Sequence, residues 1–177
     1  MDASLYFNDY KNIVTNSIGV PAIINGIPTI PVYPSNQGSG ETYGLELSAD
    51  LQVNDNWKII TSYSYINFDI KYGAAMADTE TIPPTHQFNI RSHLNFAENW
   101  ELDNILYYMD KIASGNNEID NYVRFDTRIA YKPNKNWEFS IVGQNLFDDW
   151  HQEFFPFQYQ PSAEIGRSVY GSIVWKF

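Results

Sequence analysis

The sequence predicts an all-β protein: an antiparallel up-and-down meander of about eight strands, either part of a transmembrane β-barrel or a small version of one. Apolar and polar residues alternate along most of the chain, and short links between the alternating segments take turns with long ones. Most of these segments have about 11–14 residues. A usual globular strand has about 5–6 residues, and a tilted membrane-spanning strand needs about 9–11.

Composition excludes several functional classes. The chain has 177 residues, no Cys and a net charge of −10, which excludes disulfide and thiolate chemistry and disfavours binding to nucleic-acid phosphates. There is no run of about 18 apolar residues, so no transmembrane helix is expected. The first residues, MDASLYFNDY, lack a basic region and an apolar region, so no signal peptide is expected.

The clearest strand is HQFNIRSHLNF, residues 86–96, where Phe88, Ile90, Leu94 and Phe96 share one face and polar residues fill the other. Residues 42–53 and 122–132 repeat this pattern. The other expected strands are Asp2–Ile13, Trp57–Ile70, Trp100–Ile112, Trp137–Phe147 and Arg167–Phe177.

Charge separates the two faces of the three clearest strands. Their apolar faces carry no charge, and the opposite face carries Glu46, Asp50, Arg91, Arg124, Asp126, Arg128 and Lys132. A slip of one residue would turn the cations of residues 122–132 toward lipid, at about 2–4 kcal/mol for each at mid-bilayer. The pattern therefore specifies register, although a soluble barrel with an apolar interior would show the same alternation.

The links differ in length in a regular way. The short ones are residues 54–56, 97–99 and 133–136, and the long ones are Val14–Glu41, Lys71–Thr85, Ala113–Asn121 and Asp148–Gly166. In a meander all the short links, together with the C-terminus, then lie on one side. Short turns on one side and long loops on the other are typical of bacterial outer-membrane barrels.

Tryptophan marks the side of the short turns. Trp57, Trp100 and Trp137 each come first after a short turn, in NDNW, AENW and NKNW, and Trp175 is near the C-terminus. Indole suits the boundary between lipid and water, so these four residues are predicted to form an aromatic girdle. The alternative is that each Trp fills the bottom of a soluble barrel.

The segments WEFSIVGQNLFDDWHQEF and EIGRSVYGSIVWKF, residues 137–154 and 164–177, closely resemble the C-terminal end of TonB-dependent outer-membrane receptors, which import ferric siderophores and similar metal chelates. Residues 41–65 and 83–96 resemble later strands of that family. The resemblance places GQNLFD, residues 143–148, near the outer end of the penultimate strand. It also implies that Phe177, with Trp175 and Ile173, is the C-terminal signal read by the barrel-assembly machinery.

The resemblance implies a receptor with an N-terminal plug, a TonB box and a barrel of about 22 strands. Residues 1–177 show about eight strands and neither plug nor TonB box, so the expectation is a C-terminal segment of such a barrel, incomplete for transport alone. The implied location is the outer membrane of a Gram-negative bacterium. The implied partners are the lipid bilayer, the assembly machinery and, in a full-length parent, TonB and a siderophore or metal chelate.

Catalytic, cofactor and metal sites are not expected. His86 and His93 are separated by an odd number of residues and face opposite sides of one strand, and His151 lies in a long link. No catalytic or phosphate-binding motif occurs, so an enzyme is not expected. The candidate ligand-contact loop is 148–166, with Trp150, His151, Phe154 and Phe155; alternatively, its aromatic residues form an upper girdle.

Two other functions fit the same pattern. One is a stand-alone eight-stranded outer-membrane barrel with a structural or adhesive role. The other is a soluble, lipocalin-like ligand binder, whose polar faces would point outward.

Overall fold

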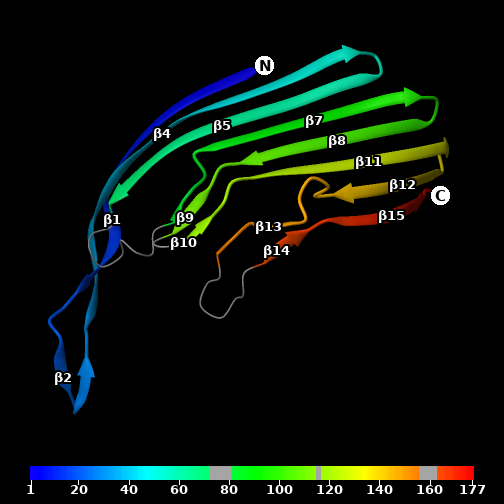
Figure 1. Cartoon of the computed structure of the whole chain (residues 1–177). Helices are drawn as coiled ribbons and strands as arrows, with labels where there is room; N and C mark the ends of the chain where they lie inside the picture. Colours follow the sequence, from blue (N-terminus) through cyan, green and yellow to red (C-terminus); the bar gives the residue numbers. More distant parts are fainter. Residues whose placement is uncertain (72–80, 115–116, 156–162) are drawn as a thin grey trace.

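The computed structural model describes residues 1–71, 81–114, 117–155 and 163–177, and within these ranges no helix is long and apolar enough to cross a membrane. Its main sheet is antiparallel and follows chain order, which confirms the predicted meander (Figure 1). The eight strands of this sheet are β1 (Asp2–Ile18), β4 (Val32–Asn54), β5 (Trp57–Lys71), β7 (His86–Ala97), β8 (Trp100–Met109), β11 (Tyr122–Asn134), β12 (Trp137–Gln144) and β15 (Ser168–Trp175).

Short strands lie at the end of the sheet opposite the short turns (Figure 1). They form one three-stranded and two two-stranded sheets from β2 (Ala22–Ile24), β3 (Ile27–Thr29), β6 (Thr81–Ile82), β9 (Ile112–Ser114), β10 (Asn117–Ile119), β13 (Trp150–Gln152) and β14 (Glu164–Gly166). The short turns and the C-terminus gather at the other end, as the link lengths predicted.

The first hairpin is longer than predicted. The expectation of a long link over Val14–Glu41 was wrong, because β1 and β4 stay paired as far as Ile18 and Val32. Pro34 suggested a loop, yet in the described residues this part of β4 pairs only with β1, and an edge tolerates a residue without an N–H. What remains of the link is the β2–β3 hairpin, where Asn25 and Gly26 adopt φ values of 52° and 81°.

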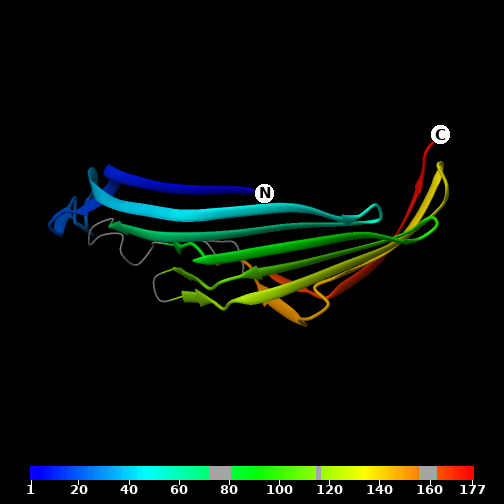
Figure 2. The same cartoon turned by 90° about the horizontal axis from the view of Figure 1, so that it is seen from above.

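The register places the predicted charged residues on one face. One row across the sheet runs from Glu46 through Ser64 and Gln87 to Met109, and the charged positions of β4, β7 and β11 share this parity. Two cavities, of about 770 and 500 Å³, open on this polar face. The sheet curves in the view from above (Figure 2). Because both cavities open on the polar face, we call this face the hollow side and the other face the outward side.

The sheet is open. β1 and β15 form its two edges, and the hydrogen-bonded order ends at each of them. A closed eight-stranded barrel requires these strands to pair with each other, and neither ladder of β1 or β15 contains such a pair.

Candidate functional site on the polar face and its two rims

Two of the three short turns are built alike. Asn54 Oδ1 accepts a hydrogen bond from Asn56 N at 2.9 Å, and Asn134 Oδ1 accepts one from Asn136 N at the same distance. Asparagine favours such turns because its side chain mimics a backbone acceptor. This local chemistry explains the Asn-x-Asn sequence in two of the three repeats.

The Asn before each Trp ties its hairpin to the next one. The carbonyls of Asn56, Asn99 and Asn136 accept bonds of 2.8 Å from the backbone N–H groups of Asn95, Lys132 and Lys176. In each case the donor belongs to the next strand along the sheet or directly follows it. The repeat therefore marks the last backbone bond between neighbouring hairpins.

Three of the four predicted girdle residues, Trp57, Trp100 and Trp137, follow a regular stagger, and the fourth, Trp175, lies directly opposite Trp137. The row from Trp57 meets β8 at Leu102, two residues beyond Trp100. The row from Trp100 meets β12 at Phe139, again two residues beyond Trp137. Two residues span about 7 Å along a strand and two strand spacings about 10 Å, so Trp57, Trp100 and Trp137 lie level if the strands tilt by about 35°, as in transmembrane barrels.

Aromatic contacts join these residues on the outward side. Trp137 pairs with Trp175, and their rings stack with centroids 5.7 Å apart. The ring of Trp100 lies 4.7 Å from that of Tyr131, and Trp57 Nε1 donates to Ser92 Oγ at 2.9 Å. The C-terminal triad of the predicted assembly signal is also exposed, with Ile173, Trp175 and Phe177 at 68, 59 and 104%.

Charged rows mark the opposite limit of the outward face. Asp9, Glu41 and Asp69 are direct cross-strand neighbours on β1, β4 and β5. The next outward row contains Lys11, Ser39 and Lys71, and Lys11 Nζ lies 2.9 Å from Asp9 Oδ2. Carboxylates placed directly opposite one another repel, so this row needs counter-charge or water.

Between the two limits the outward face of β5 is uncharged. Trp57 and Asp69 are twelve residues apart, and the outward positions between them hold Ile59, Thr61, Tyr63, Tyr65 and Asn67. Twelve residues span about 40 Å along the strand, or about 32 Å along the axis at a tilt of about 35°. The hydrocarbon core of a bilayer is about 30 Å thick.

An ion-pair network covers the hollow side of β8, β11 and β12. Arg128 lies 2.8 Å from Asp103 and 3.4 Å from Glu101 and also contacts Glu138, while Lys132 contacts both glutamates. His93 Nδ1 lies 2.6 Å from Asp103 Oδ1. Sequence reasoning identified Arg128 and Lys132 but not their carboxylate partners, because those pairs depend on cross-strand register.

The GQNLFD motif is anchored to β11. Asn145 is fully buried with a φ of 52°, its N–H donates to Asp126 Oδ1 at 2.9 Å, and its Nδ2 donates to the carbonyl of Ile165 at 2.9 Å. Asp126 also receives two hydrogen bonds from Arg124, at 3.0 and 2.8 Å. Asn tolerates a positive φ better than most residues, so this position ends β12 and fixes the following link.

The candidate ligand-contact loop divides into exposed and buried side chains. Trp150 and Phe154 are 59 and 47% exposed, and Phe155 is half-buried. His151 is 7% exposed, stacks on Tyr122 with centroids 4.0 Å apart, and lies 3.1 Å from Glu153. Residues 156–162 of this loop lie outside the described residues. Sequence reasoning did not place Tyr122 and Glu153 beside His151, since only the returning loop brings these three residues together.

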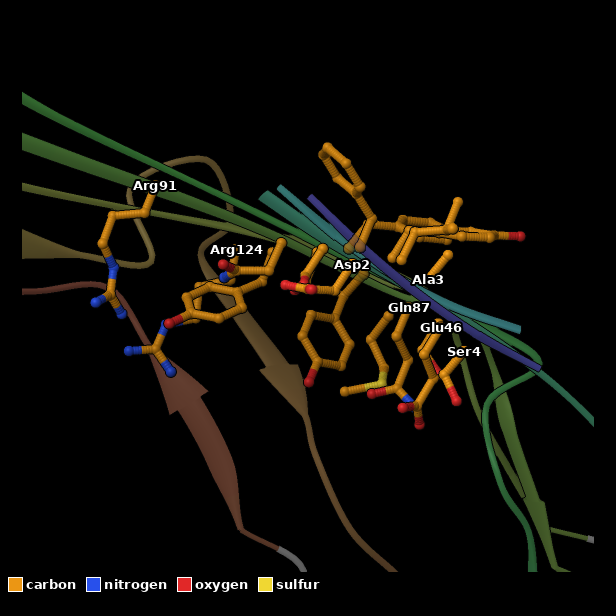
Figure 3. Close-up of a pocket in the computed structure, with 18 of the residues that line it drawn as sticks. Asp2, Ala3, Ser4, Glu46, Gln87, Arg91 and Arg124 are labelled. Carbon is orange, nitrogen blue, oxygen red and sulfur yellow. The ribbon is translucent and has the colours of Figure 1, made fainter. Parts of the chain in front are cut away.

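The larger cavity joins the N-terminal strand to β11 (Figure 3). Asp2, Ser4 and Glu46 line one part of it, and Arg91 and Arg124 line another. Gln87, Asn89 and Tyr107 lie between them in the strand order. The smaller cavity continues past Arg91 to Asp103, Arg128 and Tyr170.

Comparison with known proteins agrees with this architecture. The family model described as "TonB dependent receptor-like, beta-barrel" matches residues 1–146. The chain belongs to this family. The family is one of receptors and transporters, not one of enzymes, and its barrels are outer-membrane proteins of Gram-negative bacteria.

Solved structures show the same fold. The closed form of the ferric-catecholate import receptor Fiu from E. coli K12 matches 97% of this chain with a TM-score of 0.74 and 19% identity. The siderophore receptor PiuA from Acinetobacter baumannii matches 97% with a TM-score of 0.71 and 18% identity. The copper transporter OprC matches 99% with a TM-score of 0.66 and 18% identity. The chain spans 24, 25 and 29% of these three structures.

Proposed function

We propose that this chain contributes a wall of an outer-membrane barrel through which a ferric siderophore or a similar metal chelate is imported. The open sheet carries this proposal, because both cavities open on its polar, charged side and the outward side of β5 is uncharged over a bilayer's thickness. Lipid tolerates no unpaired sheet edge, so β1 and β15 need further strands beside them. Fiu, a ferric-catecholate import receptor, and PiuA, a siderophore receptor, support the ligand class.

This placement in the membrane assigns roles to the predicted girdle residues and to the C-terminal residues. Trp57, Trp100, Trp137 and Trp175 lie at the boundary of the bilayer, near the short turns. Phe177, Trp175 and Ile173 provide the signal for the assembly machinery, and their exposure on an edge strand leaves them open to it. TonB is the proposed source of energy for transport.

The loop at the opposite end provides the proposed first contact with the ligand. Trp150 and Phe154 are exposed there, and aromatic rings stack on aromatic chelators. Of the other two loop candidates, Phe155 is half-buried, and His151 is buried against Tyr122 and lies 3.1 Å from Glu153, which fixes the start of the loop.

The test is uptake in the organism that carries the gene. Cells from which the coding sequence of residues 1–177 has been deleted are given ⁵⁵Fe bound to a tricatecholate, ⁵⁵Fe bound to a hydroxamate, or a copper chelate. We expect one iron chelate to lose most of its uptake, with recovery on complementation. Unchanged uptake of all three chelates would rule out the proposed import function. Loss of copper uptake alone would rule out a ferric siderophore as the ligand and indicate a copper chelate instead.

A second test concerns location. Outer-membrane fractions are probed with an antibody raised against Trp150–Gln160. A band in these fractions that resists carbonate extraction supports the membrane placement. A band only in the soluble fraction contradicts it and favours the lipocalin-like alternative.

A further inference from the structure

A row of polar side chains crosses the outward side of the sheet. Ser92 on β7, Asn104 on β8 and Thr127 on β11 are direct cross-strand neighbours on three adjacent strands (Figure 1). Asn104 has the same parity as Trp100, so the row faces away from the two cavities. All three side chains are half-buried. An amide and two hydroxyls therefore lie on the face that the proposed function places against lipid.

The row lies within the hydrocarbon core of the bilayer. Asn104 comes four residues after Trp100, which the proposed function places at the boundary of the bilayer. Four residues span about 14 Å along a strand, or about 11 Å along the axis at a tilt of about 35°. The hydrocarbon core is about 30 Å thick, so Asn104 lies nearer to the middle of the core than to its edge. Neither water nor a lipid headgroup is available there as a hydrogen-bond partner.

The hydrogen bonds of this row leave donors without an acceptor. Thr127 Oγ1 donates to Asn104 Oδ1 at 2.7 Å, and Trp57 Nε1 donates to Ser92 Oγ at 2.9 Å. Among the residues that the structure describes, no hydrogen bond uses the amide N–H groups of Asn104 or the hydroxyl hydrogen of Ser92. A donor without an acceptor is costly in hydrocarbon, because an acyl chain cannot accept its bond. The amide of Asn104 therefore requires an acceptor from outside the chain.

Thr61 shows how a polar residue of the same face is satisfied within the chain. It lies on the outward side of β5, and its Oγ1 donates to the carbonyl of Asn89 at 3.0 Å. A hydroxyl has one hydrogen to place, and a neighbouring carbonyl accepts it. A carboxamide has two N–H donors on a fixed plane, and the sheet around Asn104 gives an acceptor to neither.

A second copy of this chain supplies that acceptor. All copies enter the membrane in the same orientation, so Asn104 lies at the same depth in each of them. A two-fold axis along the membrane normal then brings two Asn104 side chains face to face. A carboxamide is self-complementary, because its N–H groups donate while its oxygen can accept a second bond. Two facing Asn104 side chains can thus exchange hydrogen bonds, as polar side chains do between membrane-spanning segments.

The rows on either side of Asn104 are suited to packing against a second copy. They are uncharged and apolar, and they consist of Leu94, Leu102 and Ile129 on one side and of Ile90, Leu106 and Phe125 on the other. Apolar side chains around a central polar contact exclude solvent from it, as in other protein interfaces. The central amides would then be enclosed between two copies.

We propose that the outward side of β7, β8 and β11 is the interface of a two-fold symmetric dimer, in which Asn104 of each copy hydrogen-bonds to Asn104 of the other. The inference rests on the membrane placement in the proposed function and not on the ligand or on transport. It assigns an interaction surface to a face that takes no part in import.

The experiment is thiol cross-linking in outer membranes of the organism that carries the gene. Residues 1–177 contain no Cys, so Leu106→Cys adds one thiol, two residues from Asn104 on the same face. A short bis-maleimide is applied, and the antibody against Trp150–Gln160 detects the protein on a denaturing gel. We expect an adduct of twice the native mass. Adding Asn104→Leu should reduce its yield about fivefold or more, and Asn104→Gln, which keeps an amide, should reduce it less.

Leu5→Cys is the matched control. Leu5 also lies on the outward side, on β1, four strands away from β8. Its row meets β5 at Tyr65, eight residues beyond Trp57. The stagger of two residues for two strands brings Leu5 level with Leu106, which lies six residues beyond Trp100. The two thiols thus have the same depth in lipid, and Leu5→Cys should give no adduct above the wild-type background.

The outcomes separate clearly. Equal adduct from Leu5→Cys and Leu106→Cys, or an unchanged yield with Asn104→Leu, overturns the inference. An adduct of another mass identifies a different protein as the partner and also overturns it. Absence of an adduct from protein that is in the outer membrane overturns this inference alone, whereas absence of the protein from the membrane overturns the proposed function with it. Leu is favourable in lipid, so Asn104→Leu should keep the wild-type amount of protein in the membrane, which separates lost association from misfolding.

Discussion

Arg128 Nη1 lies 2.8 Å from Asp103 Oδ2, directly opposite it on the ladder between β11 and β8. This pair is the centre of a network in which Arg128 also contacts Glu101 and Glu138. Two neighbouring strands thus provide three carboxylates around one guanidinium on the hollow side of the sheet.

Removal of Arg128 should destabilise the sheet. Arg128→Gln leaves three carboxylates close together, and their side chains are only 17–24% exposed. We expect the free energy of unfolding to fall by about 1–3 kcal/mol. This is less than the loss of about 3–5 kcal/mol that follows when a fully buried ion pair is broken. The measurement is urea denaturation in detergent. The control is Lys58→Gln, which removes the exposed ion pair between Lys58 and Asp50 and should change stability little. Equal stability of both variants would contradict a central role for Arg128.

Gly44 should not tolerate a side chain. A Cβ at this position would collide with the hydroxyl of Tyr6, which pairs with Gly44, and with the carbonyl of Tyr65. We expect Gly44→Ala to cost about 1–3 kcal/mol as overpacking. The control is Gly171→Ala, whose new Cβ would meet only Ser140 O at 3.7 Å. A Gly44→Ala variant as stable as Gly171→Ala would show that Tyr6 does not cover the glycine.

Asn136 should hold the end of the last strand. Its Nδ2 donates to the carbonyl of Lys176 at 2.7 Å, while its own carbonyl accepts from the Lys176 N–H. We expect Asn136→Ala to increase hydrogen exchange at Lys176 by about threefold to tenfold, because one of two bonds is lost, worth about 0.5–1.5 kcal/mol. Asn56→Ala is the matched control, at the same position of the first short turn. Unchanged exchange at Lys176 would mean that the side-chain bond is not formed in solution.

Adjacent residues of β12 should report which face meets lipid. Ile141 is 59% exposed on the outward side, and Val142 lines the smaller cavity on the hollow side. Arg at a lipid-facing position costs about 2–4 kcal/mol at mid-bilayer, so Ile141→Arg should reduce insertion into lipid vesicles strongly. Val142→Arg should reduce it little. The reverse order would place the polar face outside and contradict the membrane assignment.

The family resemblance seen in the sequence agrees with the family match. The ion pairs on the hollow side, however, were not predictable from the sequence. Glu101, Asp103 and Glu138 have the parity of the polar face in the sequence, yet no local pattern assigns them to Arg128 and Lys132. That assignment needs the relative positions of three strands. The first hairpin was also missed, since Pro34 and Gly38 are loop residues locally and are accommodated here on a strand with one described partner.

The sequence by itself determined which residues share a face and where the short turns lie, and it places Trp57, Trp100 and Trp137 directly after those turns. These properties depend on a period of two and on turn chemistry, which act over a few residues. Only the tertiary structure decided the two-residue stagger from Trp57 to Trp100 to Trp137 and the position of Arg91 between Ile60 and Ile105. The physical reason is that register joins distant segments, so each cross-strand neighbour is fixed by turns and strand pairing rather than by its own sequence.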